Sequence, residues 1–181
     1  MKRYLTLALA IIAMTSCTSE PSLQKYFVES QEKKDFVSLD VGPSILQVKQ
    51  DALTPEQREA LKTFEKVNVL AFQVNDSNKT EYKSESEKVK KMLKGEKYQE
   101  LMHFGSGKDG GSISYVGADD DIEEFVIFAN RKENGFAVIR VLGDGMSPTA
   151  IMQMLPLLQS SNLDMEQLKP LQQLVQPNVK P

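Results

Sequence analysis

The 181-residue sequence has few of the side chains on which most enzymatic and metal chemistry depends: one cysteine, one histidine and no tryptophan. A single cysteine cannot form an internal disulfide, and a structural zinc site needs several Cys or His ligands. Any Ser-His-Asp or Cys-His arrangement would have to use His103, and no Gly-x-Ser-x-Gly motif accompanies it. We therefore expect no catalytic residue, no metal site and no cofactor, with His103 a strand residue.

Long hydrophobic runs are also missing, apart from LTLALAIIA at Leu5–Ala13, which follows a basic start. This run is much shorter than the roughly twenty residues that a membrane-spanning helix needs, and its layout is typical of a secretory signal. The residues Thr15, Ser16 and Cys17 resemble the cleavage site of bacterial lipoprotein signal peptides. The resemblance implies cleavage between Ser16 and Cys17 and a lipid anchor on Cys17. A secreted protein with a free thiol is the alternative.

The composition after the signal indicates one domain on a tether. We expect a signal peptide at 1–16, the lipidated cysteine and a polar tether at 17–34, a domain at 35–165 and a tail at 166–181. An apolar patch at 26–28 either begins a helix of the domain or forms a binding segment. Removal of the signal leaves 20 basic and 25 acidic residues, a net charge of about −5 without a basic cluster, so nucleic acid is not an expected partner.

Hydrophobic patterning in the middle of the chain predicts alternating strands and helices. Strands are expected at 35–41, 67–74, 98–104, 112–116, 122–129 and 136–142, and helices at 44–50, from 54, at 79–94 and from 147. Thr54 and Gln57 have the spacing of a capping box, and Asn134-Gly135 is typical of a hairpin turn. We expect a single α+β domain with a mostly antiparallel sheet of about five or six strands packed with helices.

The two strands at 122–129 and 136–142 are apolar on both faces, apart from Glu123, Glu124 and Arg140, and are therefore expected in the middle of the sheet.

The densest acidic cluster is a candidate ligand or cation site. It consists of Asp119, Asp120, Asp121 and Glu123, with Glu124 beside them. Calcium prefers carboxylate oxygens, but the spaced ligands of a calcium loop are missing, and a solvated turn also explains the cluster. Paired-carboxylate hydrolysis is disfavoured, because neighbouring residues on a strand point to opposite faces.

A glycine-containing loop is a candidate anion site, because it joins a strand to a helix start where free amides can hold an anion. Its residues are Gly143, Gly145 and Ser147. No Gly-Lys-Ser/Thr follows, so this is not a phosphate-binding P-loop. A sharp chain reversal explains the glycines equally well.

Four segments together resemble the bacterial envelope lipoprotein family that carries domain of unknown function 4252. They are KTFEKVNVLAF (62–72), YQELMHF (98–104), DIEEFVIFA (121–129) and GFAVIRVLGDGMSPTAIMQML (135–155). The resemblance extends over about residues 36–162 and implies that 98–104 is a strand leading into a hairpin. Pro156 departs from the family pattern. The family has no assigned reaction, so it supplies no site residues.

These observations predict a lipid-anchored, non-catalytic binding or accessory protein of the bacterial cell envelope. The expected partners are the membrane, through the lipid on Cys17, and an unknown envelope protein or small ligand. The outer membrane is the expected location, on either its periplasmic or its surface side. The alternatives are an envelope-stress sensor linked to sigma-factor systems, which the family resemblance suggests, and a hydrolase that uses the acidic cluster.

Overall fold

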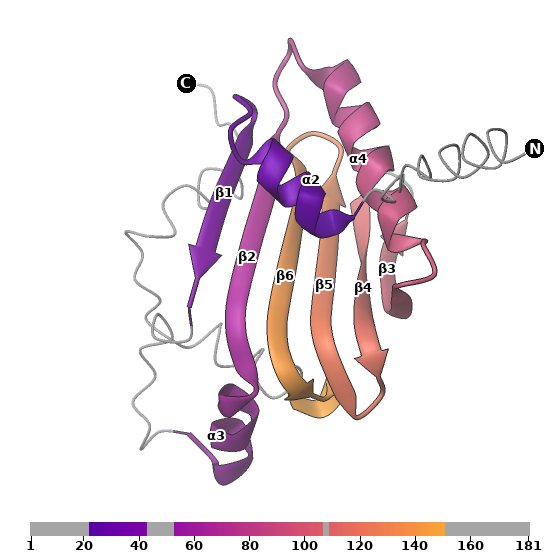
Figure 1. Ribbon diagram of the computed structural model, residues 1–181. Coiled ribbons are helices and arrows are strands. Elements are labelled where there is room, and N and C mark those ends of the chain that lie inside the picture. Colours follow the sequence, from indigo (N-terminus) through magenta and orange to yellow (C-terminus); the bar gives the residue numbers. More distant parts are fainter. Residues whose placement is uncertain (1–21, 43–52, 107–108, 151–181) are drawn as a thin grey trace, which may run out of the picture.

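A computed structural model describes residues 22–42, 53–106 and 109–150 (Figure 1). Their helices and strands, in chain order, are α2 (Leu23–Ser30), β1 (Phe36–Val41), α3 (Pro55–Lys62), β2 (Phe64–Gln73), α4 (Lys79–Leu93), β3 (Gln99–Ser106), β4 (Asp109–Ala118), β5 (Asp121–Arg131) and β6 (Gly135–Met146). Among these residues, no helix is both long enough and apolar enough to cross a membrane.

The strands form one six-stranded sheet in the order β1-β2-β6-β5-β4-β3, and every neighbouring pair is antiparallel. The expected α+β fold is therefore confirmed. β5 and β6 lie inside the sheet, as their apolar composition predicts, and β3 and β4 form the expected hairpin. The hairpin between β5 and β6 turns at Asn134-Gly135, where Gly135 has a φ of 127°.

Two helices, α2 and α4, pack on one face of the sheet and bury its main hydrophobic core. Figure 1 shows α2 crossing the upper part of the strands, with α4 beside it and α3 at the opposite end. Aromatic rings from three adjacent strands meet under the helices: Phe72 stacks on Phe136 at 5.6 Å between ring centroids, and Phe36 meets Phe72 edge-on at 5.0 Å. A second apolar cluster lies around Phe125.

Helix α2 corrects the expected start of the domain. Residues 17–34 are expected to form a tether, but α2 packs into the core through Leu23, Tyr26 and Phe27, whose exposed fractions are at most 8 %. The i, i+3, i+4 spacing of these residues puts them on one helix face. The stripe is short and polar residues flank it, so it is difficult to recognise in the sequence. Of the two alternatives for the apolar patch at 26–28, the structure shows a helix of the domain.

Local capping signals agree with the structure. Thr54 and Gln57 form the expected capping box at the start of α3, with both reciprocal hydrogen bonds present. Other expectations lie outside the described residues: Ser16 and Cys17, the helix at 44–50, all of the last helix beyond Ala150, and the C-terminal tail.

Within the described ranges, one buried side-chain oxygen, the hydroxyl of Ser30, has no hydrogen bond of good geometry. Ser30 lies at the end of α2 with no exposed surface, and its hydroxyl is near that of Tyr26. Replacing Ser30 by alanine should raise the free energy of unfolding by about 1 kcal/mol, because it removes an unsatisfied polar atom and favours the helix. Urea denaturation followed by circular dichroism measures the change.

The matched control is Ser86→Ala on α4. Ser86 is also buried, but its hydroxyl donates to Asn130 Oδ1 at 3.3 Å, so its removal should lower the free energy of unfolding by about 1 kcal/mol. Equal destabilisation by the two substitutions would show that the Ser30 hydroxyl is satisfied in solution.

Candidate functional site

A polar cavity of about 430 Å³ lies on the helix-bearing face of the sheet, beside α2. Side chains from one helix and four strands line it: Phe27 and Val28 of α2, Ser38 and Asp40 of β1, Lys66 and Asn68 of β2, Glu123 and Glu124 of β5, and Arg140 of β6, together with Lys97. It is the place where charged groups interrupt an otherwise apolar sheet face.

Strand register explains why these groups gather. Residues two apart on a strand share a face, and paired residues on adjacent strands lie side by side. Under the helices, one such row consists of Phe36, Phe72 and Phe136. Four residues along each strand, on the same face, the row consists of Asp40, Asn68 and Arg140. The same face therefore changes from aromatic to polar and charged within four residues along each strand.

A buried ion pair forms one wall of the cavity. Arg140 Nε donates to Glu124 Oε1 at 2.7 Å, and the two side chains are 7 % and 5 % exposed. The guanidinium carbon of Arg140 lies 5.4 Å from the centre of the Phe27 ring, and Lys97 Nζ lies 3.6 Å from the other oxygen of Glu124. Both carboxylate oxygens of Glu124 thus face a cation, which offsets part of the cost of burying the charge.

A second charged group occupies the β1 side of the cavity. Asn68 donates to one oxygen of Asp40, and Lys66 Nζ lies 2.9 Å from the other. Burial alone would raise the pKa of Asp40, but the hydrogen bonds from Lys66 and Asn68 and the charges of Lys66 and Arg140 outweigh it and lower the pKa below its ordinary value. Asp40 is therefore a carboxylate at neutral pH.

The cavity presents both signs of charge at close range. Its ionisable lining residues are cationic at Lys66, Lys97 and Arg140 and acidic at Asp40, Glu65, Glu123 and Glu124. Tyr98 is close enough to respond to these charges: burial and then the charge of Glu124 raise its pKa to about 12. Such a site suits a ligand or peptide with polar groups of both kinds.

The predicted acidic cluster is divided by the structure. Asp119, Asp120 and Asp121 are exposed at the turn between β4 and β5, where Tyr115 donates its hydroxyl hydrogen to Asp119. This hydrogen bond, together with burial and the charge of Asp119, raises the pKa of Tyr115. In the described ranges, no three His, Cys, Asp or Glu side chains form a group that could hold a metal ion.

Glu123 belongs to the cavity and corrects one expectation. Val116 of β4 pairs with Glu124 and the next residue, Gly117, pairs with Ile122, so Glu123 is an extra residue of β5 opposite β4. Glu123 and Glu124 consequently line the same cavity, although regular alternation would place them on opposite faces. The expectation that neighbouring carboxylates on this strand lie on opposite faces is therefore wrong for Glu123 and Glu124.

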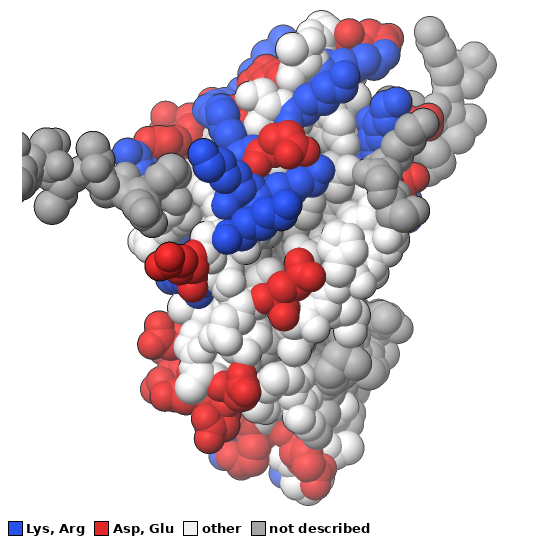
Figure 2. Space-filling model, turned by 90° about the vertical axis from the view of Figure 1, so that its right-hand side faces the viewer, with Lys and Arg blue, Asp and Glu red and all other residues white. Residues whose placement is uncertain are grey.

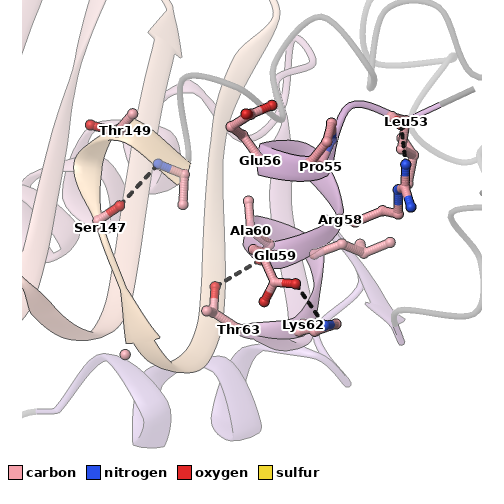
Figure 3. A pocket seen from close by; sticks show the side chains of 13 residues that line it. Leu53, Pro55, Glu56, Arg58, Glu59, Ala60, Lys62, Thr63, Ser147 and Thr149 are labelled. Carbon is pink, nitrogen blue, oxygen red and sulfur yellow. Dashed lines mark hydrogen bonds and ion pairs between the residues drawn. The ribbon is translucent and has the colours of Figure 1, made fainter.

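The predicted anion loop is divided between two cavities. Gly143 lines the polar cavity, whereas Gly145 and Ser147 line a larger one of about 930 Å³ between α3 and the chain after β6 (Figure 3). Ser147 Oγ accepts a hydrogen bond from the Ala150 amide at 3.1 Å, so its hydroxyl already caps the helical turn that starts here. An anion site at this loop stays a prediction.

The polar groups of α3 that face the larger cavity are satisfied locally. Lys62 bonds to Glu59 at 2.7 Å, Arg58 donates to the Leu53 carbonyl at 3.3 Å, and Thr63 donates to the Ala60 carbonyl at 2.8 Å (Figure 3). We therefore take the polar cavity beside α2, with its buried charges, as the stronger candidate.

Only some of the residues of the candidate site can be recognised from the sequence. Arg140 and Glu124 stood out as charged residues within apolar strands, whereas Asp40 and Asn68 lie in strands whose pairing the sequence does not reveal. His103, the only histidine, is exposed on the edge strand β3.

Comparison with known families agrees with the resemblance noted from the sequence. The profile described as Domain of unknown function (DUF4252) matches residues 26–154, more than half of the chain, and the protein belongs to this family. The match begins inside α2, which supports the inclusion of this helix in the domain. No curated protein and no solved structure matches the chain.

Proposed function

We propose that this chain is a lipid-anchored, non-catalytic binding or accessory protein of the bacterial cell envelope, held at the outer membrane through Cys17, whose polar cavity beside α2 receives an envelope protein. The observation that carries the proposal is the buried Arg140–Glu124 pair in the cavity wall. Apolar side chains of similar volume are often at least as stabilising as a buried ion pair. Stability alone therefore does not account for these charges in the cavity wall, and a role in recognising a binding partner does.

The electrostatics of the cavity support binding rather than acid–base catalysis. A general acid or base works best with a pKa near the operating pH. The pKa of Asp40 is instead lowered, away from neutral pH, and its two oxygens are occupied by Lys66 and Asn68. The carboxylate of Glu124 is likewise held by Arg140 and Lys97. These groups fit fixed hydrogen-bonding partners better than groups that exchange protons with a substrate.

A photoreactive amino acid at Ser38, an exposed residue that lines the cavity, tests the proposal in living cells. Irradiation should capture one dominant envelope protein, identified by mass spectrometry. The same amino acid at Lys83, an exposed position of α4 that does not line the cavity, should capture at least about tenfold less. Equal capture from both positions would argue against the cavity as the binding site.

The anchor is tested in the same strain through Cys17→Ala. This variant should lose palmitate labelling and, with it, capture from Ser38, because the chain no longer resides beside its partner. Thr18→Ala, which changes the next residue but keeps the thiol, should retain both. Normal palmitate labelling of Cys17→Ala would refute the lipid anchor.

A further inference from the structure

A groove of about 830 Å³ runs between α2 and α4, on the face of the sheet that carries both helices. It lies on the other side of α2 from the polar cavity, and Lys97 lines both. Its lining is rich in lysine: Lys25 and Lys33 from α2 and its C-terminal loop, Lys88 and Lys91 from α4, and Lys97 after α4. Figure 2 shows Lys and Arg side chains gathered on the upper part of one face, with some Asp and Glu side chains among them and others below.

The groove is positively charged although the chain as a whole is acidic. Two acidic residues, Glu29 and Glu96, line it beside the five lysines. A third, Glu85, is buried, accepting a hydrogen bond from Tyr26 at 2.8 Å and pairing with Lys88 at 2.8 Å and Lys33 at 3.6 Å. The five lysines therefore outnumber the acidic residues of the groove even when Glu85 is included. The whole chain, by contrast, has a net charge of −3.

The lysines are available to an external anion. The side chains of Lys25, Lys88 and Lys97 are 60 %, 56 % and 59 % exposed even though each has an acidic neighbour. Lys91 has no acidic partner among the residues that the structure describes. No arginine lines the groove. Flexible, strongly hydrated ammonium groups suit many phosphates at variable positions better than one ligand in a fixed geometry.

The groove lies close in sequence to Cys17, and this indicates which anions it meets. Ser22 and Lys25 line the groove, and α2 begins at Leu23, six positions after Cys17. Six residues span at most about 20 Å even when fully extended. A lipid on Cys17 would thus keep the groove close enough for its lysines to reach the headgroups, and within a Debye length of an anionic bilayer each basic residue strengthens attachment.

We propose that the α2–α4 lysine groove docks onto anionic phospholipid headgroups. The proposal rests on the lipid anchor proposed above, and it fixes an orientation. α2 carries lining residues of both sites: Lys25 and Glu29 line the groove, and Phe27 and Val28 line the polar cavity. Docking through the groove would therefore place the partner-binding cavity next to the membrane surface.

Vesicle binding of the full mature chain from residue 17, carrying Cys17→Ser so that no acyl chain contributes, tests the docking. Co-sedimentation with equimolar phosphatidylglycerol and phosphatidylcholine should exceed that with phosphatidylcholine alone by about tenfold, and the difference should shrink as salt is added. The double variant Lys25→Gln/Lys91→Gln should lose about tenfold of this binding.

The matched control is Lys62→Gln/Lys132→Gln, which removes the same charge outside the groove. It should bind like the parent chain, and circular dichroism checks that both variants are folded. Equal binding to both vesicle types, or an equal loss in the control, would overturn the docking. Palmitate labelling of Cys17 is independent of this assay, so a failed anchor and a failed docking surface are distinguishable.

Discussion

Replacing Arg140 by alanine should lower the free energy of unfolding by about 3–5 kcal/mol, because it leaves the carboxylate of Glu124 buried without its main partner. Glu124 is 5 % exposed and accepts from Arg140 Nε at 2.7 Å. The remaining cation, Lys97, is 3.6 Å away and largely solvated. Urea denaturation followed by circular dichroism measures the loss, which is one of the largest we expect from a single substitution.

Two further variants show what the pair does. Lys97→Ala removes an exposed charge from the same carboxylate and should cost less than about 1 kcal/mol. The double variant Arg140→Met/Glu124→Leu removes both charges and should recover most of the loss, because apolar side chains can replace a buried pair at little cost. A double variant as unstable as Arg140→Ala would show that the pair itself holds the sheet together.

The double variant also connects stability with function. If it folds like the parent protein but no longer captures a partner from Ser38, the charges serve recognition at the cavity. If capture is unchanged, the proposed binding site is contradicted, since its central charges would be dispensable. The comparison is informative because stability is matched between the two proteins.

Much of the fold follows from local sequence signals, because each depends on residues that are near neighbours in the chain. The capping box at Thr54 fixes the start of α3, and Asn134-Gly135 fixes the turn between β5 and β6. The apolar composition of β5 and β6 is sufficient to place them inside the sheet. Helix α2 was harder to recognise because its apolar stripe is short and lies among polar residues.

The candidate site depends on distant pairings and was only partly predictable. Asp40 and Asn68 come together because β1 pairs with β2 in one register, and a shift of one residue would put the two side chains on opposite faces of the sheet. The irregularity at Glu123 likewise arises where β5 pairs with β4 and has no local marker. Charged residues within apolar strands, such as Arg140, were the usable signal.

Replacing Gly135 by alanine should cost about 3–5 kcal/mol, because two separate penalties combine at this hairpin. Its φ of 127° is strained for a residue with a side chain, and a Cβ atom would lie 1.8 Å from the carbonyl oxygen of Phe72 on β2. The neighbouring backbone must move to relieve the clash, and Phe72 lies at the centre of the stacked aromatic core. Thermal and urea unfolding measure the loss.

Gly145→Ala separates the two penalties. Gly145 also has a positive φ, 64°, but a Cβ atom there would have no neighbour within 4 Å among the described residues. Its substitution should therefore cost only about 1–2 kcal/mol, the price of a left-handed conformation for alanine. The excess at Gly135 then measures the rigidity of the contact between β2 and β6. Similar losses at both glycines would mean that the hairpin shifts freely, and that the aromatic core tolerates a displaced β2 backbone.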